Sequence, residues 1–286
     1  MPELPEVETT ARILKTKLVG KKIADVKIFS QKQFPNDPKL IIGSKIVNIK
    51  RRAKILVIYL DKLVLIIHLK LTGQLVYADK TEKGKAVFGH PIPLSGGSSL
   101  PGRSTRVTLE FSDRSVLYFN DLRKFGWIKI IPKSKFDIET FDNLGIEPFS
   151  KYFTSEALEK IFAKTRRAIK TVLMDQKLIA GIGNIYANEA LFVAKINPQR
   201  PANSLSRKET DLLARAILQT LKKAVANQGT SAADDAYIKP DGSKGNNQNH
   251  LLVYQKTGSN CPNCSGKIKR ITLGGRGTFF CPNCQK

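Results

Sequence analysis

Apolar residues near the start of the chain recur at the spacing of an α-helix. Over residues 3–20 they follow one another at intervals of 4, 3 and 4 residues: Val7, Ala11, Leu14 and Leu18. Such spacing places them on one face of a helix. Gly20 stands where the helix would end, because glycine readily adopts the left-handed backbone of a helix terminus. The pattern predicts an amphipathic helix that packs one face on a core.

From residue 22 to about 132 the sequence pattern changes to runs of β-branched and aromatic residues. The runs are KIADVKIF, KIVNIKRRAKILVIYL, LVLIIHLKLTGQLVYA, RVTLEFSDRSVLYF and GWIKII. Their alternation of apolar and polar positions predicts strands of an antiparallel β-sandwich. Between the third and fourth runs lies a polar stretch of about 25 residues rich in Gly, Pro and Ser. We expect a long loop at 80–104, to which no role is assigned.

A helical period returns from 154 to 228. The clearest helix is expected at 207–227, where Ser206 and Glu209 have the S-x-x-E spacing of a capping box. Gly229 follows as a stop signal. Before this region, residues 132–150 have weak periodicity and are expected to form a connector. After it, residues 229–260 begin as a polar loop and finish in a strand-like piece, LLVYQ.

The strong net positive charge of the chain indicates a polyanionic partner. The 286 residues include 48 Lys and Arg against 24 Asp and Glu, a net charge of +24, and the basic residues occur in every segment. A polyanion is the natural partner, because many cations can displace condensed counterions from a phosphate backbone. Nucleic acid is favoured, with an anionic membrane surface and ribosomal RNA as the alternatives. A length of 286 residues allows two domains, and 41% hydrophobic residues is ordinary for a globular protein.

No segment has the pattern of a membrane span or a secretory leader. The longest apolar runs, such as VLIIHL at 64–69, are far shorter than the roughly 20 residues that cross a bilayer. The first residues carry two glutamates and lack a basic stretch followed by an apolar one. We therefore expect a cytoplasmic protein without a membrane partner.

The four cysteines have the spacing of a metal site. They form the pattern C-x2-C-x16-C-x2-C: Cys261, Cys264, Cys281 and Cys284. Two such knuckles hold one Zn²⁺ tetrahedrally, and four sulfur ligands leave no open position, so the metal would be structural. Two disulfides or a redox pair are the alternatives. The paired spacing and the lack of secretory features favour zinc.

Two further stretches have features of anion sites. Between the cysteine pairs, KIKRITLGGRGTFF predicts a hairpin with Gly274 and Gly275 at its turn and Arg276 beside it. Arg276 would reach a phosphate or a groove there, or be an ordinary solvated arginine. In residues 176–194, two glycines separate two apolar stretches expected to be helical, and Asn184 falls at a helix start. Free backbone N–H groups at such a start bind anions, although a glycine turn between helices is also a common packing device.

Three side chains in the β-rich half are candidates for chemistry or DNA contact. Lys54, in RRAKIL, leads into a buried-looking strand and either delivers its ammonium to a site or lies on a solvated edge. Arg123 and Phe125, in DLRKFGW, stand at a turn suited to a wedge between stacked bases, unless Phe125 packs in the core. His68 lies in a strand, where a lone histidine is more often a hydrogen-bonding group than a catalyst.

Taken together, four stretches resemble one family. PELPEVETT, RRAKIL, AGIGNIYANEALF and the cysteine ribbon with GRGTFFC are similar to the bacterial formamidopyrimidine-DNA glycosylases. The resemblance implies an α+β fold: an N-terminal helix on an antiparallel β-sandwich, a helix-two-turns-helix domain and a C-terminal zinc ribbon. The implied division is 1–131 for the catalytic domain, 132–150 for a linker, 151–228 for the DNA-binding domain, 229–260 for a lesion-covering loop and connector, and 261–286 for the ribbon.

The resemblance also implies an activity and a set of catalytic residues. Family members excise oxidised purines such as 8-oxoguanine and formamidopyrimidines from duplex DNA in base excision repair, then cut the strand by β,δ-elimination. By that resemblance Pro2, freed by removal of Met1, is the nucleophile that forms a Schiff base, and Glu3 is its acid/base partner. Lys54 and Arg276 act in catalysis and phosphate contact. The partner is damaged double-stranded DNA, and we expect a monomeric bacterial protein associated with the nucleoid.

The remaining expectations concern DNA contacts. Asn184, Arg276, His68 and Tyr186 correspond to the family's backbone contacts. Arg123, Phe125 and Leu71 correspond to residues that fill the gap left by a flipped base. One departure is Leu71, which stands in HLKLTG where many relatives have methionine. Because leucine is branched but of similar volume, we expect the wedge to survive with altered fit.

Two alternatives to this function remain. The sister branch, endonuclease VIII, shares the ribbon and the terminal proline, prefers oxidised pyrimidines and usually begins PEGPE. This chain begins PELPE after Met1, which favours the purine branch. The second alternative is a non-catalytic zinc-ribbon DNA-binding module or a ribosomal accessory protein, which would leave the Pro2-Glu3 start unexplained.

Overall fold

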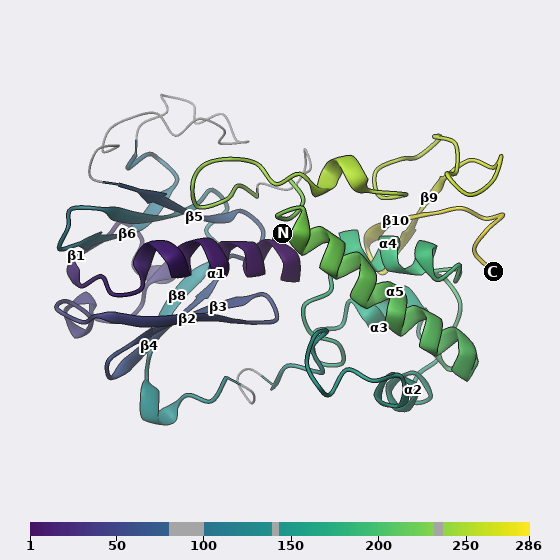
Figure 1. Cartoon of the computed structure of the whole chain (residues 1–286), viewed down its shortest axis with the longest axis horizontal. Helices are drawn as coiled ribbons and strands as arrows, with labels where there is room; N and C mark the ends of the chain where they lie inside the picture. Colours follow the sequence, from purple (N-terminus) through teal and green to yellow (C-terminus); the bar gives the residue numbers. More distant parts are fainter. Residues whose placement is uncertain (80–99, 139–142, 232–236) are drawn as a thin grey trace. The chain divides into compact units, whose positions relative to one another are not determined.

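The computed structural model describes residues 1–79, 100–138, 143–231 and 237–286. The chain divides into two compact units, the first made of Met1–Glu139 with Asn227–Gln248 and the second of Thr140–Ala226 with Asn249–Lys286. Figure 1 shows the elements of each unit. Most of the expected 80–104 loop and part of the expected lesion-covering loop, residues 232–236, lie outside the described residues.

The first unit begins with the expected amphipathic helix, α1 (Leu4–Leu18). All four residues of the predicted apolar face are buried, and Gly20 beyond the end of the helix has a φ of +92°. In Figure 1 the purple helix α1 lies between the two sheets of its unit. Its apolar face shares one core cluster with residues of both sheets, among them Ile58, Leu65 and Phe119. Burying this face anchors the N-terminus on the sandwich.

The β-rich segment forms the predicted antiparallel sandwich. Within the described residues one sheet has the order β1 (Ile23–Ile28), β6 (Thr105–Phe111), β7 (Val116–Asp121), β5 (Gly73–Ala78). The other has the order β2 (Ile46–Arg52), β3 (Ile55–Leu60), β4 (Leu63–His68), β8 (Trp127–Pro132). Three of the predicted runs each contain two strands. They are interrupted where Ala53, Lys70 and Arg114 adopt positive φ angles of 51°, 52° and 70°.

Residues 227–248 belong to the same unit as the sandwich. The backbone N–H of Thr230 donates to Glu6 Oε1 of α1 at 2.8 Å, and that of Tyr77 donates to Pro240 O at 2.7 Å. Burial raises the pKa of Tyr237, and the nearby Glu6 carboxylate raises it further. At Gly229, with a φ of +83°, a Cβ would lie 2.9 Å from the Tyr237 ring. The segment therefore closes on the start of α1 because glycine leaves room there.

The second unit is helical and ends in a hairpin. It contains α2 (Ser155–Phe162), α3 (Ile169–Leu173), α4 (Asn184–Val193), α5 (Arg207–Ala226), β9 (Lys269–Leu273) and β10 (Arg276–Phe280). The helix start at Asn184 and the ribbon hairpin are confirmed. The expected helix at 176–180 is wrong. That stretch forms turns, in which the Gln176 amide donates to Met174 O and Ile182 O, both at 2.8 Å.

The expected strand LLVYQ is also wrong. Glu189 of α4 accepts the backbone N–H groups of Leu252, Val253 and Tyr254 at 2.7, 2.9 and 2.8 Å. These groups therefore have a side-chain partner in place of a neighbouring strand. Burial raises the pKa of Glu189, while the three N–H groups favour its ionised form.

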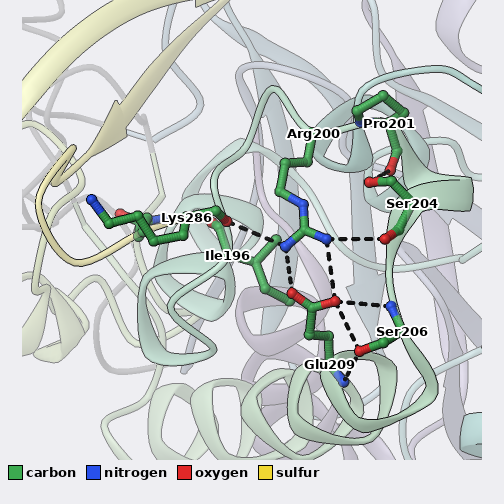
Figure 2. A network of polar contacts seen from close by, with 8 residues as sticks. Ile196, Arg200, Pro201, Ser204, Ser206, Glu209 and Lys286 are labelled. Carbon is green, nitrogen blue, oxygen red and sulfur yellow. Dashed lines mark hydrogen bonds and ion pairs between the residues drawn. The ribbon is translucent and has the colours of Figure 1, made fainter.

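The predicted capping box begins α5. Ser206 Oγ accepts from the Glu209 N–H at 3.3 Å, and the Ser206 N–H donates to Glu209 Oε2 at 2.8 Å. Figure 2 shows that Arg200 joins this box. Its guanidinium contacts both Glu209 oxygens and donates to Ser204 O at 3.0 Å and Lys286 O at 3.4 Å. The start of α5 and the C-terminal residue are thus tied to one arginine.

This network predicts an acid-dependent loss of stability. Hydrogen bonding to Arg200 lowers the pKa of Glu209 from 4.5 to about 2. Because the folded-state pKa is the lower one, the contribution is complete above pH 4.5 and is lost as the pH falls towards 2. We expect Glu209→Gln to lower the free energy of unfolding by about 1 kcal/mol at pH 7. The difference from wild type should shrink between pH 4.5 and 2, as measured by urea unfolding, and a constant difference would contradict the assignment.

Candidate active site and nucleic-acid interface

The start of α1 holds the predicted nucleophile and acid. Pro2 and Glu3 are buried directly before Leu4, the first residue of the helix. The Glu3 N–H donates to Glu6 Oε2 at 2.8 Å, while Glu6 Oε1 accepts from Thr230. One buried carboxylate thereby fixes the backbone beside Pro2 to residues 227–248. Sequence reasoning missed Glu6, although a glutamate three residues into a predicted helix is a known capping signal.

Lys54 lies at the turn between β2 and β3 and is 4% exposed. Arg51 connects this turn to α1, because its Nε donates to Glu8 Oε2 at 2.9 Å and its Nη1 to Ala53 O at 3.0 Å. Burial raises the pKa of Glu8, but Arg51 and Arg12 outweigh it, so the pKa lies below its ordinary value. The ion pair therefore holds the turn with Lys54 against α1, the helix that follows Pro2.

His68 ends β4 and faces Ile55 across the strand pair. Burial, together with the charges of Lys70 and Lys54, lowers its pKa to about 3. Its Nδ1 accepts the Lys70 N–H at 3.0 Å. The imidazole is therefore neutral near pH 7 with its proton on Nε2, and it is suited to donating a hydrogen bond.

The predicted wedge residues lie on two segments of the first unit. Arg123 and Phe125 are in the loop between β7 and β8, with the Arg123 guanidinium 5.1 Å from the centre of the Phe125 ring. Phe125 is 50% exposed, so the alternative in which it packs in the core is wrong. Leu71 is partly exposed in the turn that precedes β5.

In the second unit a buried lysine connects Asn184, a predicted phosphate-binding residue, to the strand that begins with Arg276, the other one. Lys170 is fully buried, and its Nζ donates to Asn184 Oδ1 at 2.7 Å, Gly277 O at 2.9 Å and Thr278 Oγ1 at 2.7 Å. Gly277 follows Arg276 directly. The ammonium therefore fixes the start of α4 to the strand that begins with Arg276. No sequence signal identified Lys170, which has the pattern of a solvent-facing helical lysine.

Arg276 is exposed directly after Gly274 and Gly275, whose φ angles are 59° and 70°. The hairpin is also fixed to α4, because the Phe279 N–H donates to Asn188 Oδ1 at 2.8 Å. Tyr186 lies within α4 and is 1% exposed, so its side chain packs inside the unit.

The four cysteines form the predicted metal site. Their sulfur atoms all lie within 4.8 Å of one another, with Cys261 and Cys284 at 3.8 Å and Cys264 and Cys281 at 3.6 Å. Sulfurs about 2.3 Å from a tetrahedral zinc would be separated by roughly 3.8 Å. A disulfide would need about 2.05 Å. The donor set therefore fits one structural Zn²⁺ and not the alternative of two disulfides.

The surroundings of the sulfurs favour a bound cation. The Gly266 N–H donates to Cys264 Sγ at 3.4 Å and lowers the pKa of that thiol to about 7. In contrast, the neighbouring Cys264 raises the pKa of Cys284 to about 12. Crowded sulfurs resist ionising together, and a divalent cation removes that cost.

Comparison with known proteins agrees with this geometry. The N-terminal domain model of formamidopyrimidine-DNA glycosylase matches residues 1–128, and the H2TH domain model of the same enzyme matches residues 144–235. A zinc finger found in FPG and IleRS matches residues 258–286. The formamidopyrimidine-DNA glycosylase of Pelotomaculum thermopropionicum is 40% identical over 294 residues, covering 100% of this chain and 99% of that protein. The chain belongs to the formamidopyrimidine-DNA glycosylase family.

Solved structures of this family have the same fold. The Lactococcus lactis Fpg in complex with abasic-site DNA has a TM-score of 0.86 and 32% identity, covering 99% of each chain. A mutant of that Fpg in complex with DNA containing Fapy-dG has a TM-score of 0.87 and 32% identity, covering all of both chains. The expected family, α+β fold and zinc site are confirmed. The chain is thus a DNA glycosylase of the formamidopyrimidine family, and the alternative of a non-catalytic zinc-ribbon module is wrong.

Among the described residues, no helix combines the length and the apolar character that crossing a bilayer requires.

Proposed function

We propose that this glycosylase removes oxidised purines, chiefly 8-oxoguanine and formamidopyrimidines, from duplex DNA and then cuts the strand at the abasic site. The observation that carries the proposal is the start of α1, where the Glu6 carboxylate accepts the N–H of Glu3, directly after Pro2, and the N–H of Thr230. A relative supports the substrate class, because the Lactococcus lactis Fpg forms a complex with abasic-site DNA and a mutant of it forms one with Fapy-dG DNA.

The chemistry follows from a secondary amine at a helix start. Once Met1 is removed, the Pro2 nitrogen attacks the sugar C1′, and the base leaves with the electron pair of the glycosidic bond and takes up a proton. The amine proton passes to solvent. Glu3 protonates the ring oxygen, which opens and leaves a cationic iminium. The positive end of α1 disfavours a protonated amine and so keeps Pro2 nucleophilic.

Strand cutting uses the same iminium as an electron sink. Loss of the 2′ proton sends an electron pair through the iminium and expels the 3′ phosphate, and a second elimination expels the 5′ phosphate. Water then releases the sugar fragment from Pro2. Each elimination breaks one C–O bond and one C–H bond, so no oxidant or reductant is required.

The other predicted site residues divide into phosphate contacts and gap fillers. The charge of Lys54 is close enough to lower the pKa of His68, and both side chains would bind the lesion-strand backbone from the first unit. Asn184, which Lys170 connects to the residue after Arg276, and Arg276 itself would bind phosphates from the second unit. Tyr186, two residues after Asn184 in α4, would contact the DNA backbone at the same helix start.

The gap fillers are Leu71, Arg123 and Phe125. Extruding a base leaves a hole in the stack, and an exposed ring and guanidinium held together are suited to occupy it. A net charge of +24 supports a nucleic-acid partner, and the complexes of the Lactococcus lactis relative with damaged DNA support damaged double-stranded DNA in particular. One active site per chain suffices for this chemistry, so the enzyme would act as a monomer. We also propose the domain division implied by the family resemblance: a catalytic domain at 1–131, a linker at 132–150, a DNA-binding domain at 151–228, a lesion-covering loop and connector at 229–260 and a zinc ribbon at 261–286.

Borohydride trapping tests the proposed activity. Mixed with sodium borohydride and duplexes that contain 8-oxoguanine or an abasic site, the enzyme should form a covalent protein–DNA adduct, because reduction fixes the iminium on Pro2. A parallel reaction with a thymine glycol duplex measures the release of oxidised pyrimidines, the activity of the endonuclease VIII branch. Faster release of thymine glycol than of 8-oxoguanine would overturn the purine preference, and the absence of any adduct would overturn the covalent mechanism.

A further inference from the structure

Asp121 is a buried carboxylate at the end of β7, directly before the loop that carries Arg123 and Phe125. Its Oδ2 accepts the Gly126 N–H at 2.7 Å and the Gln33 amide at 3.0 Å. Its Oδ1 accepts the Arg123 N–H at 3.2 Å and the Thr72 hydroxyl. The carboxylate therefore holds both ends of the loop.

Thr72 extends this contact to the turn that carries Leu71. Its Oγ1 donates to Asp121 and at the same time accepts the Arg123 N–H at 3.0 Å. The two segments leave the sheet side by side, because Gly73 and Asp121 pair across β5 and β7. A single hydroxyl thus connects the Leu71 turn to the Arg123 loop.

Both segments contain backbone that needs support. Lys70 and Lys124 have φ angles of 52° and 55°, a left-handed conformation that costs free energy for residues other than glycine. At Gly126 a Cβ would lie 2.8 Å from the Phe119 ring and 3.2 Å from Asp121 Oδ2. The loop closes on the carboxylate because glycine occupies this position. Strained turns of this kind persist where the surrounding structure fixes them.

We infer that Asp121 and Thr72 are positioning residues that join the Leu71 turn to the Arg123–Phe125 loop as one preassembled wedge. The inference rests on the proposed role of those three residues in filling the gap behind a flipped base. Neither Asp121 nor Thr72 touches DNA in this role. They hold the Leu71 turn and the Arg123–Phe125 loop in place beforehand, so that neither segment has to become ordered while the base is extruded.

The expected consequence is specific to substrates that must be flipped. Extruding a paired purine costs unstacking and unpairing free energy, which a preassembled wedge offsets at once. An abasic nucleotide has no base to extrude, so its processing depends less on the wedge. We call the contacts of Asp121 and Thr72 with the two segments the clamp. Loss of the clamp should therefore slow base release from lesion duplexes and leave strand cutting at abasic sites nearly unchanged.

Thr72→Val and Thr72→Ser form a matched pair for the test. Valine keeps the branched shape and removes the hydroxyl, whereas serine keeps the hydroxyl. We expect Thr72→Val to lower kcat for 8-oxoguanine release about 10-fold, with KM and cutting of abasic duplex within about threefold of wild type. Thr72→Ser should restore wild-type kcat. In a Leu71→Ala and Phe125→Ala background, Thr72→Val should have little further effect, because the wedge is already lost.

Hydrogen exchange gives a readout that does not depend on activity. Exchange of the amides of residues 122–126 should be faster in Thr72→Val than in Thr72→Ser. It should be faster still in Asp121→Asn, because in either orientation the new NH2 group would point at an N–H donor, that of Arg123 or that of Gly126. Equal exchange in all variants would overturn the clamp even if the wild-type enzyme were inactive on every lesion. Equal loss of rate on lesion and abasic duplexes would overturn its role in flipping.

Discussion

Enzyme that retains Met1 is expected to lose base release, strand cutting and borohydride trapping by about 10³-fold or more. An amide nitrogen has no available lone pair, and the peptide bond from Met1 to Pro2 is such an amide. The effect should therefore exceed that of losing any single DNA contact.

The matched control is the same preparation after treatment with methionine aminopeptidase. Intact mass identifies the fraction of chains that begin at Pro2, and activity should rise in proportion to that fraction. Affinity for a duplex with an uncleavable tetrahydrofuran site reports binding separately and should change far less than turnover. Full activity in chains shown by mass to carry Met1 would contradict Pro2 as the nucleophile.

Local patterns in the sequence were sufficient for most of the fold. Period and alternation predicted α1 and the sandwich strands because each of these elements buries one face. The S-x-x-E spacing predicted the start of α5, and the cysteine spacing predicted the metal site, because both depend on groups close together in the chain. The place of Arg123 and Phe125 in a short turn between strands was likewise predicted, although the sequence left open whether Phe125 packs in the core.

The groups that sequence reasoning missed are buried polar side chains whose partners lie far away in the chain. Lys170 contacts Gly277 and Thr278, and Glu189 contacts residues 252–254. Each looks like an ordinary surface charge until the chain folds. The LLVYQ error has this origin, since the apolar pattern was correct but the side chain of Glu189 took the backbone N–H groups. Only the tertiary structure could reveal such partners.

Glu3→Gln should separate the two halves of the reaction. A glutamine has nearly the same shape but cannot supply a proton, so we expect base release from 8-oxoguanine duplex to fall about 10²- to 10⁴-fold. An abasic sugar already opens to an aldehyde in water, and Pro2 can form the iminium there without protonation of a ring oxygen. Borohydride trapping on abasic duplex should therefore persist within about tenfold of wild type.

Glu3→Asp provides the matched control, because it keeps the acid and withdraws it by one methylene group. Its base release should lie between those of wild type and Glu3→Gln, since a misplaced acid transfers its proton less well. Thermal melting should verify that both variants retain the fold, because Glu3 is buried and its backbone N–H, which bonds Glu6, is present in either. If Glu3→Gln released 8-oxoguanine at the wild-type rate, the proton would come from another group. If trapping on abasic DNA vanished together with base release, Glu3 would instead be required to hold Pro2 in place.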